Sequence, residues 1–246
     1  MTASAPALDC AYHRAGLCDS CTRIDDSYAA QLARKQLGAE AAVPDAAWLP
    51  PQASAVEGFR NKAKMAAGGT IEAPTLGILD GERRGTDLRA CPLHEQPIRD
   101  ALPHLAELVP EARIPPYSVP ERRGELKHVL VTSSPDGELM VRFVLRSTEA
   151  VPRIAKRLDA LRERIPGLVV ASASILPEHK AALEGDVEVP LTEQQTLTMR
   201  LNGIPLALQP GGFFQTNSGV AAALYREAAS WIDDVDPASG ADLYCG

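Results

Sequence analysis

Four cysteines carry the clearest chemical signal in the sequence. Cys10, Cys18 and Cys21 form a C-x7-C-x2-C pattern near the N-terminus, and Cys91 follows much later in a Cys-Pro dipeptide. No basic and apolar leader precedes them, so we expect a cytoplasmic chain, in which thiols stay reduced and clustered cysteines favour a metal over disulfides. The sequence therefore predicts a metal site with these four cysteines as its ligands.

Two kinds of metal site fit this spacing. Structural zinc usually takes its ligands as two close pairs, whereas only Cys18 and Cys21 are close here. Uneven spacing and a ligand cysteine followed by proline are typical of iron–sulfur sites, so the spacing favours a four-thiolate cluster. His13 and His94 keep a mixed zinc site open, and four unrelated buried cysteines are the third interpretation.

The first half of the chain contains two predicted helices that would frame these cysteines. Asp25-Asp26-Ser27 is a helix start for YAAQLARKQLGAE, which we expect to end near Gly38. Residues 95–109 carry an apolar helical spacing, with an interruption expected at Pro103. Between the two helices, TIEAPTLGILDG predicts an extended run that ends in a turn.

A compact α/β insert is predicted next. Residues 127–134 and 139–146 alternate between apolar and polar around Pro-Asp-Gly-Glu, which is a strong hairpin signal. One helix face from about Ala150 to Ile165 is apolar, and LVVASASIL then predicts a buried strand. The remaining chain predicts a strand at VEVPL, a hairpin around Asn202-Gly203, a helix capped by Asn217 or Ser218, and a short strand at ADLYC.

Charge and composition exclude several classes of protein. The chain has 246 residues, 45% hydrophobic, 23% charged, with net charge −7, which excludes a disordered tail or a generally basic nucleic-acid-binding protein. No uncharged apolar stretch reaches the roughly 18 residues of a membrane span, so we expect no membrane partner. Residues 121–170 carry ten Lys and Arg against seven Asp and Glu, net +3, which leaves −10 on the remainder. A solvated helix surface explains this basic insert as well as an RNA footprint does.

Three basic residues near the middle of the first half alternate along the chain. If their segment is extended, Arg60, Lys62 and Lys64 all lie on one side of a strand. They are our candidate RNA-binding residues, and an exposed polar strand face explains them nearly as well.

Several motifs together resemble one family. The C-x7-C-x2-C pattern with a distant Cys-Pro, the block GFRNKAKM, and PGGFFQTN followed about thirty residues later by DLYCG are similar to the 23S ribosomal RNA uracil-C5 methyltransferases, in the short form that acts on uracil 747. The order and spacing of these motifs extend across nearly the whole chain. The resemblance implies 23S rRNA as partner, S-adenosylmethionine as methyl donor, and a 4Fe-4S cluster on Cys10, Cys18, Cys21 and Cys91.

The resemblance also implies site residues and an organisation. Gln215 and Tyr244 would help to hold S-adenosylmethionine. The expected fold class is α/β, with an α+β cluster region and insert leading into a truncated Rossmann-like methyltransferase domain. The expected units are residues 1–120 (cluster region and start of the scaffold), 121–185 (central α/β insert) and 186–246 (incomplete methyl-donor domain). We expect a monomer and no DNA partner.

No catalytic residue is assigned within these 246 residues. The family adds a cysteine thiolate to carbon 6 of uracil so that carbon 5 can accept the methyl group, and a base then removes the carbon-5 proton. We do not assign Cys245 as this nucleophile, because its neighbours Tyr244 and Gly246 match the cofactor motif. We therefore expect this chain to be inactive alone. The alternatives are a non-catalytic iron–sulfur or zinc RNA-binding module and a redox sensor.

Overall fold

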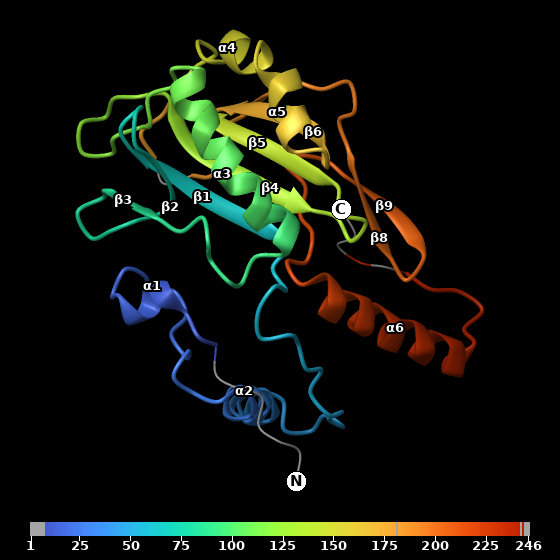
Figure 1. Ribbon diagram of the computed structural model, residues 1–246. Coiled ribbons are helices and arrows are strands. Elements are labelled where there is room, and N and C mark those ends of the chain that lie inside the picture. The colour runs from blue at the N-terminus through green and yellow to red at the C-terminus, as the bar shows by residue number, and fades with distance from the viewer. Residues whose placement is uncertain (1–7, 181, 242, 244–246) are drawn as a thin grey trace.

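A single mixed sheet organises the chain. The computed structural model describes residues 8–180, 182–241 and 243. Within them, seven strands form one sheet in which only the β5–β6 pair is parallel (Figure 1). In spatial order these are β3 (Gly85–Asp87), β2 (Pro74–Leu79), β1 (Lys62–Gly69), β4 (Leu126–Ser133), β5 (Leu139–Leu145), β6 (Leu168–Ile175) and β7 (Val187–Pro190).

Three helices cover one face of this sheet. They are α3 (Gln96–Glu111), α4 (Val151–Ala155) and α5 (Leu158–Arg164), and α3 crosses the sheet in Figure 1. Alternate strand residues face these helices, since Ala63, Val129 and Val131 are fully buried in the same apolar cluster as the helix residues Leu102 and Leu161. This alternation of residues between the two faces follows from the pleat of a strand.

The opposite face is only partly covered, and by a different kind of element. A hairpin of β8 (Leu197–Leu201) and β9 (Ile204–Leu208) packs on Met140 and Val170. Beside it, Arg142 is nearly buried and its guanidinium donates to Glu188 at 2.9 and 3.0 Å and also to Glu184. These ion pairs fix β7 and the segment before it against β5.

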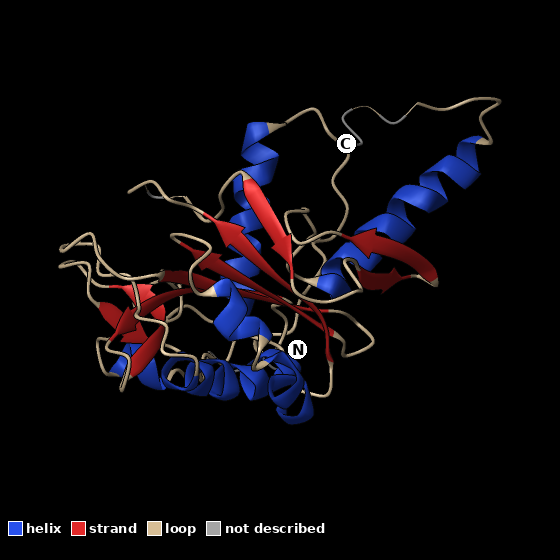
Figure 2. Ribbon diagram, turned by 90° about the horizontal axis from the view of Figure 1, so that it is seen from above, coloured by secondary structure: helices blue, strands red, loops and turns tan. Residues whose placement is uncertain are grey.

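The helices at the two ends of the chain contribute little to the core. Helix α1 (Ala11–Arg14) and helix α2 (Tyr28–Ala42) bury no residue, and α6 (Ser218–Val235) buries only Ala221. The view from above shows α6 projecting away from the sheet (Figure 2). Its exposed large apolar side chains are Leu224, Tyr225, Trp231, Ile232 and Val235.

Most of the predicted local structure is confirmed. Ser27 caps α2, the two hairpins form as predicted, and Asn202 and Gly203 both have positive φ, as a two-residue hairpin turn requires. Asn217 caps α6 by accepting a hydrogen bond from the Val220 amide at 3.0 Å. The α/β fold class is confirmed, with a mostly antiparallel sheet. The strand predicted at 241–245 falls largely outside the described residues.

Three helix predictions are wrong in detail. Helix α2 does not end near Gly38 but continues to Ala42. Helix α3 continues through Pro103, because this proline lies on the exposed side, where the carbonyl it leaves unpaired can reach water. The helix predicted from Ala150 is instead two short helices, α4 and α5, although its predicted apolar face is buried. Strands from all three predicted units join the one sheet, and the division into those units stays a prediction. No helix in the described chain is both long and apolar enough to cross a membrane.

Candidate functional site

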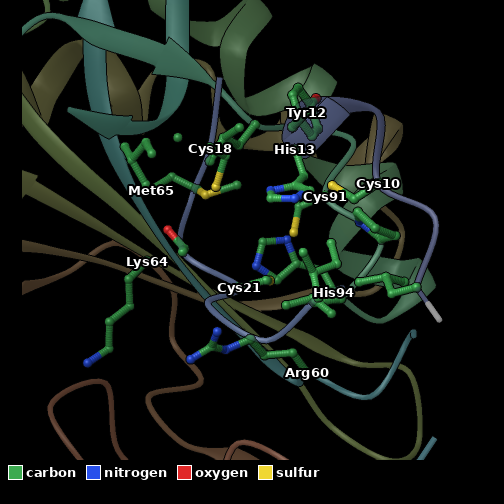
Figure 3. Close-up of a pocket in the computed structure, with 18 of the residues that line it drawn as sticks. Cys10, Tyr12, His13, Cys18, Cys21, Arg60, Lys64, Met65, Cys91 and His94 are labelled. Carbon is green, nitrogen blue, oxygen red and sulfur yellow. The ribbon is translucent and has the colours of Figure 1, made fainter. Parts of the chain in front are cut away.

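The four predicted ligand cysteines line one cavity of about 270 Å³ (Figure 3). Cys10 is the N-cap of α1, Cys18 and Cys21 follow in the next loop, and Cys91 lies in the loop between β3 and α3. All four side chains are half-buried. Residues separated by up to 81 positions in the sequence are therefore brought to one place by the fold.

Backbone hydrogen bonds fix the loop that carries Cys91. The Gly58 and Arg60 amides donate to the carbonyls of Pro92 and Leu93, at 2.9 and 2.8 Å. From the N-terminal segment, the Tyr12 hydroxyl accepts a hydrogen bond from the Ala90 amide at 3.1 Å. These contacts hold the N-terminal cysteines and Cys91 together without any bond between the thiols.

The thiols influence one another electrostatically. Burial raises the pKa of Cys21, and the charges of Cys91, Cys18 and Cys10 raise it further. Burial also raises the pKa of Cys91, again with contributions from Cys10 and Cys18. Arg60 acts in the opposite direction on both thiols. Deprotonating several of these cysteines is therefore unfavourable unless a positive centre lies between them.

The described cysteines form no disulfide. Within residues 8–180, 182–241 and 243, no three His, Cys, Asp or Glu side chains are arranged to hold a single metal ion. His13 and His94 also line the cavity, and Met65, Ile78 and Leu88 make part of its wall apolar. The fold brings the predicted donor residues to one cavity but does not place them around a single point.

The predicted basic residues lie at the same cavity. Arg60, Lys62 and Lys64 all line it, and the intervening Asn61 and Ala63 are buried, as alternation along an extended segment predicts. Arg60 and Lys64 are exposed and Lys62 is half-buried. Burial lowers the pKa of Lys62, and the neighbouring positive charge of Lys64 lowers it further. Their role in RNA binding stays a prediction.

Gln215 lies in the loop before α6, with its side chain exposed and its backbone fixed. Its carbonyl accepts a hydrogen bond from the Asn61 side-chain amide at 2.9 Å, and the same amide donates to the Ser218 hydroxyl at 2.7 Å. The Asn61 backbone amide also donates to the Thr216 carbonyl at 2.9 Å. The other predicted cofactor residue, Tyr244, lies outside the described residues, as does Cys245.

Sequence reasoning missed Asn61. It is 1% exposed and joins β1 to the loop that precedes α6. The available signal was its place in the alternating segment, where a polar residue occupies a position predicted to be buried. A buried amide must find partners, and those partners lie more than 150 residues further along the chain.

Comparisons with known proteins find relatives that are named as RNA methyltransferases. No family model matches it. It is 46% identical over 242 residues to a 23S rRNA (uracil(747)-C(5))-methyltransferase RlmC of Halothiobacillus neapolitanus, and 42% identical over 243 residues to the protein of that name from Xenorhabdus bovienii. Each alignment covers 97% of this chain and 64% of the relative, so the chain spans less than two thirds of these relatives.

The fold is also found in a solved structure. The chain superposes with a TM-score of 0.69 on the crystal structure of Pyrococcus abyssi tRNA (uracil-54, C5)-methyltransferase in complex with S-adenosyl-L-homocysteine. That alignment covers 87% of this chain and 50% of the other, at 21% identity, so it establishes the fold. Across nearly its whole length, this chain is thus a homologue of curated proteins named 23S rRNA (uracil(747)-C(5))-methyltransferase RlmC.

Proposed function

We propose that this chain serves S-adenosylmethionine-dependent methylation of carbon 5 of a uracil in 23S ribosomal RNA, with uracil 747 as the first candidate. The observation that carries the proposal is the 41–46% identity to relatives of that name over 97% of the chain. The similarity in fold to a tRNA uracil-C5 methyltransferase supports the same class of reaction. An rRNA substrate would place the activity in the cytoplasm.

The cysteine cavity is the proposed site of a 4Fe-4S cluster held by Cys10, Cys18, Cys21 and Cys91. The donor set fits, because four half-buried thiols line one partly apolar cavity, and burial together with the neighbouring thiols raises the pKa of Cys21 and Cys91. Each thiolate of such a cluster binds a different iron, so the four sulfurs need not converge on one point as ligands of zinc must. A bound cluster would supply the positive centre that neutralises the thiolates and would tie the N-terminal segment to the loop of Cys91.

Gln215 and Tyr244 are the proposed contacts to S-adenosylmethionine. Asn61, Thr216 and Ser218 support this assignment for Gln215, because they hold the loop in place while its side chain remains exposed. A side chain on a fixed backbone loses little entropy when it binds a ligand. When bound, S-adenosylmethionine supplies an electrophilic methyl group.

Carbon 5 of uracil is a weak nucleophile, so the reaction requires covalent activation of the ring and a base. The four described cysteines are assigned to the cluster, and we assign no nucleophile among the described residues. The target base must also leave its stack to be reached. The proposed contribution of the described residues is therefore to bind RNA, in part through Arg60, Lys62 and Lys64, and to position the cofactor loop.

The proposal is tested by deleting the gene for this protein in its source organism and mapping 5-methyluridine in 23S rRNA by mass spectrometry. We expect the mark at uracil 747 to disappear and to return on complementation with the wild-type gene. Persistence of the mark in the deletion strain would overturn the proposal. A non-catalytic RNA-binding module also predicts persistence, so the same experiment separates the two functions.

A further inference from the structure

A second cavity, of about 620 Å³, lies on the sheet face that the helices leave open. It is bounded by β1, β2 and β4, by the segment around Tyr117, and by residues after β6. Its volume is within the usual range for small-ligand sites, roughly 300–1,000 Å³. It adjoins the cysteine cavity, and Lys64, Gly77 and Ile78 border both.

The charged side chains that line this cavity are all basic. Its described lining includes Lys64, Arg83, Lys127 and Lys180 and contains no carboxylate side chain. Lys180 lies 3.5 Å from the Glu178 carboxylate, whereas the other three make no ion pair with any described residue. Four segments distant in sequence therefore supply cations to one pocket, which is a site for an anion.

The most buried of these cations is held in a fixed position. Lys127 is 5% exposed, and its ammonium group lies 4.7 Å from the centre of the Tyr117 ring and donates to the Glu178 carbonyl at 2.6 Å. Burial lowers the pKa of Lys127. The Glu178 and Glu125 carboxylates favour the charged form of Lys127 without forming an ion pair with it, so a phosphate in the pocket would supply a direct negative partner.

An aromatic side chain lies beside the cations. The Tyr117 hydroxyl and His179 Nδ1 are 3.0 Å apart, which orients the exposed imidazole ring at the pocket. Proteins that bind unpaired RNA combine cations that contact the phosphate backbone with a ring on which a base can stack.

We propose that this pocket binds one unpaired ribonucleotide of the RNA substrate, with its phosphate at Lys64, Arg83, Lys127 and Lys180 and its base against His179. The proposal rests on the function proposed above, because it requires an RNA ligand. It adds a contact on the sheet face in which Arg83, Lys127, His179 and Lys180 lie outside the cysteine cavity and the loop of Gln215.

The test is the affinity of this chain for a 23S rRNA fragment containing uracil 747, measured by fluorescence anisotropy over a range of salt concentrations. We compare the double variant Arg83→Gln, Lys180→Gln, which leaves Lys64 of the cysteine cavity intact, with a control, Lys156→Gln, Arg162→Gln, which removes the same charge from exposed residues on the helix side. The pocket variant should bind about tenfold more weakly. The slope of log affinity against log salt concentration should be smaller in magnitude by about one to two for the pocket variant. The control should keep the affinity and the slope of wild type.

A second pair of variants tests the stacking contact. His179→Ala should weaken binding about fivefold or more, and His179→Phe, which keeps a flat ring, should restore most of it. Equal affinities of the pocket and control variants, with wild type still selective for the rRNA fragment, would overturn the pocket proposal alone. If wild type binds this fragment no better than unrelated RNA of equal length, the proposed function fails as well. Weakened binding of free uridine monophosphate with unchanged RNA binding would assign the pocket to a mononucleotide and overturn the proposal.

Discussion

The side chain of Asn61 donates a hydrogen bond to the backbone carbonyl of Gln215 across 154 residues of sequence, at 2.9 Å. Because Asn61 also reaches the Ser218 hydroxyl and the Thr216 carbonyl, one buried amino acid fixes the whole loop before α6. The Ser133 amide in turn donates to the Asn61 carbonyl at 2.8 Å, which joins this loop to β4.

Asn61→Ala should lower the free energy of unfolding by about 1–3 kcal/mol, because it leaves the Gln215 carbonyl and the Ser218 hydroxyl without their donor at a part-buried position. Asn61→Asp should cost at least as much, since it replaces the donor by a carboxylate facing that carbonyl. Urea denaturation measures both changes. Gln52→Ala is the control, since Gln52 is exposed and bonds only to its neighbour, and it should stay within about 0.5 kcal/mol of wild type. An Asn61→Ala protein as stable as this control would contradict the role given to Asn61.

The cysteine site should bind iron in proportion to its intact thiols. Protein reconstituted without oxygen should contain about four iron and four sulfide per chain. Cys18→Ser and Cys91→Ser should each reduce both contents sharply, because each removes one thiolate from the cavity. Ser20→Ala, which changes a lining residue that carries no thiol, should leave them unchanged. Colourless protein containing one zinc per chain would contradict the cluster.

Acid should destabilise the protein through His128. Burial lowers the pKa of His128 to about 4 from its ordinary 6.5, and the positive charge of Lys127 contributes. Because the folded state prefers the neutral ring, stability is unaffected above about pH 6.5, falls as the pH decreases toward 4, and reaches its full loss below that value. The loss is on the order of 3 kcal/mol at most.

The measurement is the free energy of unfolding of wild type and His128→Gln between pH 8 and 4. The difference between them should change in favour of the variant as the pH falls through this window. Parallel curves for wild type and His128→Gln would contradict the prediction.

Two glycines should respond to alanine in opposite directions. At Gly77 in β2, a Cβ would lie 2.0 Å from the Thr86 carbonyl oxygen and 2.8 Å from the Leu88 amide nitrogen, so Gly77→Ala forces backbone apart. We expect a loss of more than about 2 kcal/mol in the free energy of unfolding. At Gly38, in exposed α2, a Cβ meets nothing, and Gly38→Ala should add about 0.5–1 kcal/mol. Thermal unfolding of the two variants measures both changes. A Gly77→Ala protein as stable as wild type would show that β2 and β3 are not packed as described.

Local signals in the sequence predicted the elements well. Turn residues such as Asn202-Gly203 and the capping residue Asn217 act on neighbours only a few positions away. Their effect can therefore be predicted from a short stretch of sequence. The four cysteines could be grouped because metal ligands follow known spacings. The alternation that places Arg60 and Lys64 on one face was also correctly predicted, because it depends only on the period-two geometry of an extended segment.

Long-range pairing could not be predicted in this way. Nothing near Lys62 indicates that β1 lies beside β4, because that pairing depends on how all the apolar faces are buried together. The second cavity was missed for a similar reason. Arg83, Lys127 and Lys180 belong to different local sequence patterns. Only the folded sheet brings them to the lining of one cavity.

The pairing of β1 with β4 also limits how the protein can be cut. Residues Lys62–Ala66 pair with His128–Thr132, so the chain crosses from one predicted unit to the next in the middle of the sheet. A protein divided between residues 116 and 126 would expose two apolar strand edges, each a template for pairing with another chain. We expect such fragments to aggregate when expressed separately and to recover solubility when expressed together, which would make this position a site for a split reporter of assembly.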